Sequence, residues 1–122
     1  MATTIVDKDG NRISASDATI PSDRHFRNAW VISGSTISED LATAKEIFKD
    51  KIREVRKPLL EEEDVVYMKA LEADDADAKA ASVTKKTNLR NAPAATAITN
   101  ASSISALKAA WDTDLLGDSP YA

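Results

Sequence analysis

The chain has 122 residues, with 16 basic and 20 acidic side chains and a formal net charge of −4. One histidine and no cysteine exclude a disulfide framework, a thiol nucleophile and a zinc site built from several histidines or cysteines of one chain, and no glycine-rich phosphate-binding motif occurs. Alanine supplies 21 of the 52 hydrophobic residues, so we expect a thin core that depends on long helices or on a partner for stability.

Residues 1–37 are predicted to form a small β-element. The pair Asp9-Gly10 lies between residues 4–6, which include Ile5 and Val6, and residues 11–13, which include Ile13. An Asp-Gly pair with apolar flanks is a strong short-range signal for a β-hairpin, because both residues tolerate the backbone of a tight turn. Another strand is expected at residues 29–33, and the glycine that follows allows the chain to turn back. The element is therefore expected to be antiparallel.

The clearest pattern is a long helix from about residue 38 to residue 73. Its start has the spacing of a capping box from Thr36 to Glu39, and Ser38 is a competing N-cap. Six apolar residues recur at helical spacing: Leu41, Ala44, Phe48, Ile52, Val55 and Leu59. At 100° per residue they fall within about an 80° arc, a narrow seam typical of a helix that packs against another helix.

A single proline interrupts this helix pattern. Pro58 removes a backbone hydrogen bond and clashes with the preceding turn, yet Val66, Ala70 and Ala73 continue the face of the seam beyond it. Either one helix is kinked there, or a new helix starts at Pro58 with the acidic residues 61–64 in its first turns. Before the proline, acids and bases alternate at i,i+3 spacing: Glu46 with Lys49, Asp50 with Arg53 and Glu54 with Lys57. These charges predict a solvated face or electrostatic complementarity to a neighbouring chain.

The hairpin and the C-terminal segment complete the predicted fold. Residues 76–90 are rich in alanine and predict a returning helix, so residues 38–92 would form an αα-hairpin. Residues 93–122 are expected to be a linker, extended or loosely packed, followed by a short helix that Ser103, or Ser102, caps and that Gly117 closes. Its Trp111 would dock either onto the hairpin or onto another protein.

No pattern identifies a catalytic, cofactor or metal site. His25 has no nucleophile or carboxylate partner at a recognisable spacing, and residues 61–64 lack the alternation of a calcium loop. The basic residues between Lys49 and Lys57 are mixed with acids and include no aromatic side chain, which argues against nucleic-acid binding. No apolar run approaches the roughly 20 residues that span a bilayer, and the N-terminus does not resemble a signal peptide. We expect a non-enzymatic protein that uses no cofactor and binds neither nucleic acid nor membrane.

Four segments, in order, resemble a family of small tailed-bacteriophage proteins associated with tail or tail-fibre genes. Residues 23–30 resemble its D-R-x-F-R-x-A-W opening, and residues 52–73 resemble its R-x-x-R-x-x-x-L-x-x-x-D-x-x-F-M-x-A-x-E segment. Residues 85–93 are similar to its K-x-x-L-R-D segment with a following proline, and residues 105–111 resemble its closing L-K-x-x-W. The helical hairpin also resembles phage tail assembly chaperones and tail-fibre assembly proteins, which often carry a tryptophan where Val65 or Val66 stands here. The family carries no catalytic motif.

The expected fold is α+β and mainly α, with a small N-terminal β-hairpin element, a long kinked helical hairpin and a short C-terminal helix. The resemblance implies a virion structural protein of the phage tail, baseplate or fibre-attachment region, made in the host cytoplasm; the alternative is a transient tail or tail-fibre assembly chaperone. Its partners would be other tail, fibre or baseplate chains, within an oligomer or larger assembly. The candidate interface residues are Trp30, Phe48, Ile52, Val55, Leu59, Leu107 and Trp111.

Overall fold

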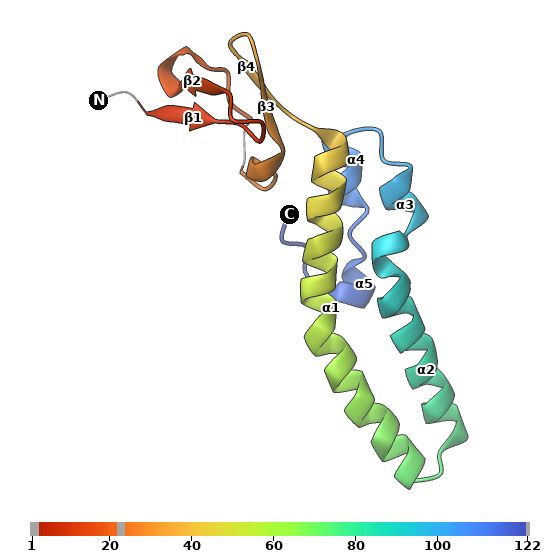
Figure 1. Cartoon of the computed structure of the whole chain (residues 1–122). Coiled ribbons are helices and arrows are strands. Elements are labelled where there is room, and N and C mark those ends of the chain that lie inside the picture. Colours follow the sequence, from red (N-terminus) through yellow and green to blue (C-terminus); the bar gives the residue numbers. More distant parts are fainter. Residues whose placement is uncertain (1–2, 22–23, 122) are drawn as a thin grey trace.

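The structure is a computed structural model that describes residues 3–21 and 24–121. It confirms the mainly α, α+β fold: two antiparallel strand pairs come first, a long helical hairpin follows, and short helices close the chain (Figure 1). Predictions that fall on residues 1–2, 22–23 and 122 lie outside the described residues; they include Asp23, the first residue of the motif at 23–30.

The strands gather at one end of the long helix, the C-terminal helices lie beside the same end, and the turn of the hairpin stands clear of both (Figure 1). The elements, with η marking a 3-10 helix, are β1 (Thr4–Val6), β2 (Arg12–Ser14), η1 (Ala15–Asp17), η2 (Arg27–Ala29), β3 (Trp30–Ser33), β4 (Thr36–Glu39), α1 (Leu41–Glu72), α2 (Ala76–Asn91), η3 (Ala92–Ala94), α3 (Thr96–Thr99), α4 (Ile104–Ala109) and α5 (Thr113–Leu116). β1 pairs with β2 and β3 with β4, both antiparallel.

The predicted Asp-Gly hairpin forms, and a nearby aspartate fixes its turn. Gly10 takes a φ of 87° in this turn. One carboxylate oxygen of Asp7 accepts hydrogen bonds from the backbone N–H groups of Asp9 and Asn11, both at 2.9 Å. The other accepts from the backbone N–H of Ile32 at 2.9 Å, so one side chain ties the first hairpin to β3. These bonds, the one from Ile32 first, hold the pKa of Asp7 below its usual value.

Trp30 is the centre of a small N-terminal core. Trp30 is fully buried, and it packs with the buried side chains of Ile5 from β1 and Ile37 from β4. The guanidinium of Arg27 lies 4.5 Å from the centre of the indole ring and donates a hydrogen bond to the carbonyl of Val6 at 2.8 Å. Trp30 therefore joins the two hairpins of this chain to each other.

α1 begins later than the sequence predicts. Residues 36–39 form β4, so neither Thr36 nor Ser38 is the N-cap. Asp40 takes that position, accepting hydrogen bonds from the backbone N–H of Thr43 at 3.1 Å and from its hydroxyl. Hydrogen bonds from Thr43 also lower the pKa of Asp40. The capping-box prediction was wrong because pairing with β3 draws the backbone of these residues into a strand.

α1 runs as one helix from Leu41 to Glu72 with Pro58 inside it. The alternative of a second helix starting at Pro58 is therefore wrong, and the acidic residues 61–64 lie in the middle of the helix. Its axis bends about halfway along its length (Figure 1). A bend at this level is expected, because a proline ring displaces the preceding turn and removes one helical hydrogen bond.

The C-terminal segment folds back onto the hairpin. The expectation of an extended or loosely packed linker is wrong, because η3 and α3 follow α2 directly and Ile98 is fully buried. Ser103 caps α4 as predicted. The single helix expected before Gly117 is instead two, α4 and α5, because Asp112 provides a second N-cap just after Trp111. The indole N–H of Trp111 donates to the carbonyl of Gly117 at 3.0 Å.

The main core is concentrated in one half of the hairpin. Its buried residues are Phe26, Ala29, Ala44, Phe48, Ile52, Leu89, Ile98, Ala101, Leu107, Trp111, Leu116 and Tyr121. On α1 they all precede Pro58. We call residues 41–57, with the segments that pack on them, the proximal half. Residues 59–72 of α1 with residues 76–88 of α2 are the distal half.

Candidate protein interface

The structure places the seven candidate interface residues in contacts within the chain. Trp30 lies in the N-terminal core; Phe48, Ile52, Leu107 and Trp111 are buried in the main core; Val55 and Leu59 are partly buried against it. The periodicity correctly marked a buried seam, but its neighbours are other segments of this chain. A surface available to a partner in this conformation must lie elsewhere.

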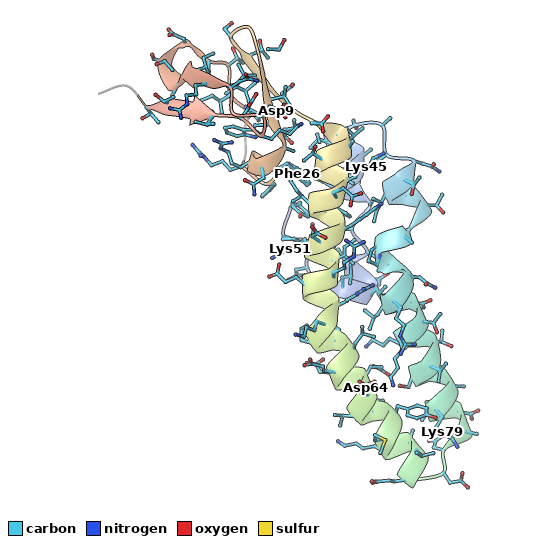
Figure 2. All side chains as sticks on the ribbon, viewed as in Figure 1. Asp9, Phe26, Lys45, Lys51, Asp64 and Lys79 are labelled. Carbon is cyan, nitrogen blue, oxygen red and sulfur yellow. The ribbon has the colours of Figure 1, made fainter. Side chains whose placement is uncertain are left out.

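Trp111 docks onto the proximal half, which is one of the two alternatives left open by the sequence. Its indole meets Phe48 edge-on, with 5.7 Å between ring centres. Tyr121 stacks on Phe48 at 5.3 Å and on Phe26 at 5.0 Å, joining the C-terminal segment to both the helix and the strand region. Figure 2 shows Phe26 where the strands meet α1. Burial, together with the carboxylate of Glu54, raises the pKa of Tyr121.

The distal half has polar and small side chains on its inside. Glu63, Ala70 and Ser82 are buried where α1 faces α2. The hydroxyl of Ser82 donates to the carbonyl oxygen of Glu63 at 3.3 Å, and Lys85 Nζ lies 3.6 Å from the Glu63 carboxylate. Val66 does not continue the seam, because Glu63 and Ala70 occupy the face toward α2. The buried residues between the two helices here are therefore polar or small rather than large and apolar.

Ionic contacts across the hairpin support the same region. Lys86 Nζ lies 2.6 Å from the carboxylate of Asp64 and 4.8 Å from the centre of the Tyr67 ring. Near the turn, Lys79 Nζ lies 3.8 Å from the carboxylate of Asp74. Figure 2 shows Asp64 midway down this half and Lys79 close to its end. The two helices of the distal half are thus held together largely by ion pairs and hydrogen bonds.

Beyond Leu60, which with Leu59 packs against the main core, the large non-aromatic apolar side chains of the distal half are exposed. They are Val65, Val66, Met68, Leu71 and Val83, each 47–54% exposed. Among the described residues, the other exposed large hydrophobic side chains are Val6 and Ile20. Val65 and Met68 also line a shallow pocket of about 380 Å³, together with Asp64, Lys69 and Glu72. Four of these side chains lie within residues 65–71 of α1 and Val83 lies on α2. A concentration of exposed apolar side chains is typical of an interaction surface.

Charge divides the hairpin in the same way. Residues 45–57 carry six basic and three acidic side chains, a net charge of +3, whereas residues 61–77 carry eight acidic and one basic, a net charge of −7. In the basic part, Lys49, Arg53, Arg56 and Arg90 surround a hollow of about 260 Å³. The side chain of Arg56 donates to the carbonyls of Leu89 and Arg90 at the end of α2.

Two of the three predicted ion pairs along the proximal half form. Lys49 lies 3.6 Å from Glu46, and Arg53 lies 2.7 Å from Asp50. Glu54 instead lies 3.5 Å from Lys51 rather than beside Lys57. These exposed pairs leave most of the charge of the helix accessible to solvent and to a partner.

His25 lies at the junction of the strand region, α1 and the C-terminal segment. Its ring meets Tyr121 edge-on at 5.3 Å and lines a pocket of about 480 Å³ with Asp50 and Glu54. Among residues 3–21 and 24–121, no group of three or more histidine, cysteine, aspartate or glutamate side chains is placed to hold a metal ion. In the same described part of the chain, no helix has the length and apolar character needed to cross a membrane.

The residues that carry the phage resemblance have packing roles in this structure. Phe26, Ala29 and Trp30 of the first segment are fully buried, as is Leu89 of the third. Comparison of the chain with protein-family models, with curated proteins and with solved structures gave no match.

Proposed function

We propose that this chain is a non-enzymatic structural protein of a bacteriophage virion, in the tail, baseplate or fibre-attachment region, and that it acts by packing against other virion chains. The observation that carries the interaction role is the distal half, where five large apolar side chains are exposed while Glu63 and Ser82 are buried. Burying apolar surface is the main driving force of both folding and association, so this arrangement favours completion by a partner. The phage setting rests on the four ordered segments of resemblance.

The two ends of the molecule have different tasks in this proposal. The strand region, the proximal half and the C-terminal helices form a unit held by its own core. The distal half projects from this unit (Figure 1) and presents apolar side chains in an acidic setting. In this proposal, the projecting distal half contacts a neighbouring subunit while the fold of the rest of the chain stays unchanged.

Mass spectrometry of purified virions tests the proposal. We expect the chain to be present in a fixed ratio to the tail proteins of the same particle. The alternative, a transient assembly chaperone, is supported by the resemblance of the helical hairpin to tail assembly proteins. It predicts instead that deleting the chain abolishes tails although mature particles lack it. Absence from virions, with tails formed normally without the chain, would contradict both.

Substitutions in the distal half test the interaction role separately. Val66→Asp and Val83→Asp each place a charge on exposed apolar surface, so we expect incorporation into virions to fall about tenfold or more while the circular dichroism spectrum stays unchanged. Thr84→Asp is the matched control, because Thr84 is also exposed on α2 and is polar already. Equal incorporation of all three variants would show that the distal half makes no contact in the particle.

A further inference from the structure

We propose that the hollow beside the end of α2 binds a doubly charged oxyanion, namely a phosphate group, either free or as the monoester of a small molecule. We call this site the basic hollow. Its lining consists of Pro93, Ala94 and four cationic side chains, Lys49, Arg53, Arg56 and Arg90. The site lies away from the exposed apolar side chains of the distal half, and the inference does not depend on their proposed role.

The first argument is that every charged group lining the basic hollow is a cation. At 100° per residue, Lys49, Arg53 and Arg56 fall within about a 60° arc of α1. The three acids of residues 45–57 occupy a different arc, whose middle lies about 90° further around the helix. The basic hollow therefore offers positive charge to a ligand, with no carboxylate in its lining.

The second argument is that Arg56 is held in place while part of its guanidinium stays available. Its Nη1 donates to the carbonyl oxygens of Leu89 at 3.4 Å and Arg90 at 2.8 Å. Within the described residues, the other two guanidinium nitrogens donate no hydrogen bond. A guanidinium is a rigid fork of donors that matches the oxygens of a phosphate, and fixing it before binding reduces the conformational entropy lost on binding.

The third argument is the charge that remains once the internal ion pairs are counted. Lys49 and Arg53 each pair with the acid three positions before them, at 3.6 Å and 2.7 Å. Arg56 and Arg90 form no ion pair within the described residues, so the lining keeps a surplus of two positive charges. A phosphate monoester carries a charge of about −1.5 to −2 at pH 7, which matches this surplus, whereas a single carboxylate matches only half of it.

The size and position of the basic hollow suit a compact ligand. Its volume is about 260 Å³, and one water molecule takes about 30 Å³ of the liquid, so a five-atom oxyanion fits together with several waters. The lining comes from α1, from the last turn of α2 and from η3. A phosphate bound there accepts charge-assisted hydrogen bonds from more than one of these elements, and so joins the hairpin to the start of the C-terminal segment.

Isothermal titration calorimetry of the full chain with sodium phosphate, near neutral pH and at constant ionic strength, tests the site. We expect saturable one-to-one binding with a Kd of about 1 mM or lower. Sodium acetate should bind about tenfold more weakly or worse, because its single charge leaves half of the surplus unmatched. Glycerol phosphate is the arm that distinguishes the source of the phosphate. Binding at least as tight as that of free phosphate assigns the site to a monoester, and much weaker binding assigns it to the free ion.

Matched variants separate the basic hollow from general effects of charge. Arg90 is exposed, so Arg90→Gln leaves the core unchanged, and we expect it to raise the Kd for phosphate about tenfold or more. Arg90→Lys should have an intermediate effect, because it keeps the charge and loses the fork of donors. Lys57→Gln is the control, since Lys57 is an exposed cation of α1 outside the lining, and it should change the Kd by no more than about twofold. The circular dichroism spectrum of each variant reports whether the hairpin is intact.

Three results would overturn the inference. The first is the lack of saturable binding of either phosphate or glycerol phosphate up to about 10 mM, beyond the effect of sodium chloride at the same ionic strength. The second is acetate binding as tight as phosphate binding. The third is an equal loss of affinity in Lys57→Gln and Arg90→Gln, which would show attraction to the basic part of α1 as a whole. None of these results bears on incorporation into virions, so the inference and the proposed function fail independently.

Discussion

Before Pro58, α1 buries Phe48 and Ile52 against aromatic and aliphatic side chains from the rest of the molecule; after Pro58, it buries Glu63 and Ala70 against a second helix that offers Ser82. The same helix thus changes from apolar to polar packing within a few turns. The proximal half completes its burial inside the chain, whereas the distal half leaves its larger apolar side chains outside. One end of the hairpin therefore has a core of its own, whereas the other end leaves apolar surface exposed.

The largest expected effect comes from removing the centre of the proximal core. Phe48 is fully buried and contacts the rings of Trp111 and Tyr121, so Phe48→Ala should lower the free energy of unfolding by about 3–5 kcal/mol in urea denaturation. Leu71→Ala in the distal half is the control and should change it by no more than about 0.5 kcal/mol, because Leu71 is half exposed. Equal losses at the two sites would remove the distinction between the halves.

A smaller loss is expected from enlarging a side chain inside the distal half. Ser82 is buried between α1 and α2, and its hydroxyl bonds the backbone of Glu63. Ser82→Leu should force the helices apart and lower the free energy of unfolding by about 1–3 kcal/mol. Val83→Leu, one position along and exposed, should have little effect. If Ser82→Leu stabilised the protein, the space between the distal helices would be large enough for a large apolar side chain. The separation of the helices would then not be the reason for their polar packing.

The local signals in the sequence were sufficient for the elements whose partners are close along the chain. The Asp9-Gly10 turn, the apolar seam before Pro58 and the Ser103 cap all follow from spacing within a few residues. The start of α1 did not, because strand pairing of residues 36–39 with β3 overrides a good capping pattern. Ile98 was likewise missed, since a lone large residue among small ones carries no period, and only its tertiary contacts bury it.

The candidate interface was predictable only in part, for a physical reason. Periodicity identifies a buried face but not what covers it, so Phe48 and Trp111 could equally have faced another chain. Beyond Pro58, Glu63 and Ala70 are the α1 residues buried against α2, and Val66 is left exposed. A sequence pattern that assumes every apolar residue to be buried cannot predict that Val66 is exposed while Glu63 is buried.

A further, smaller effect concerns the free energy of unfolding of the proximal core at alkaline pH. Burial, aided by Glu54, raises the pKa of Tyr121 above the value near 10 of an unfolded chain. The folded chain therefore retains a proton that the unfolded chain loses, so this contribution to stability is complete below about pH 10 and is lost as the pH rises through the folded pKa. We expect Tyr121→Phe, compared with wild type by urea denaturation, to remove that part of the alkaline loss. Glu54→Gln should retain most of it, because burial is the larger cause. Identical pH profiles for wild type and Tyr121→Phe would contradict the buried position of the ring.

The smallest expected effect on the free energy of unfolding is at Val66. It tests whether the apolar side chains of the distal half are exposed in solution. Val66 has the spacing of a core residue but is half exposed, so Val66→Ser should change the free energy of unfolding by no more than about 0.5 kcal/mol. Ile52→Ser, at a fully buried position of the same predicted seam, should lose several-fold more, because it removes apolar contacts and buries a hydroxyl. A loss at Val66 similar to that at Ile52 would mean that the distal half encloses its apolar side chains in solution, for instance between associated chains. Repeating the measurement over a range of protein concentrations separates these cases, because a loss that depends on association grows with concentration and a loss within one chain does not.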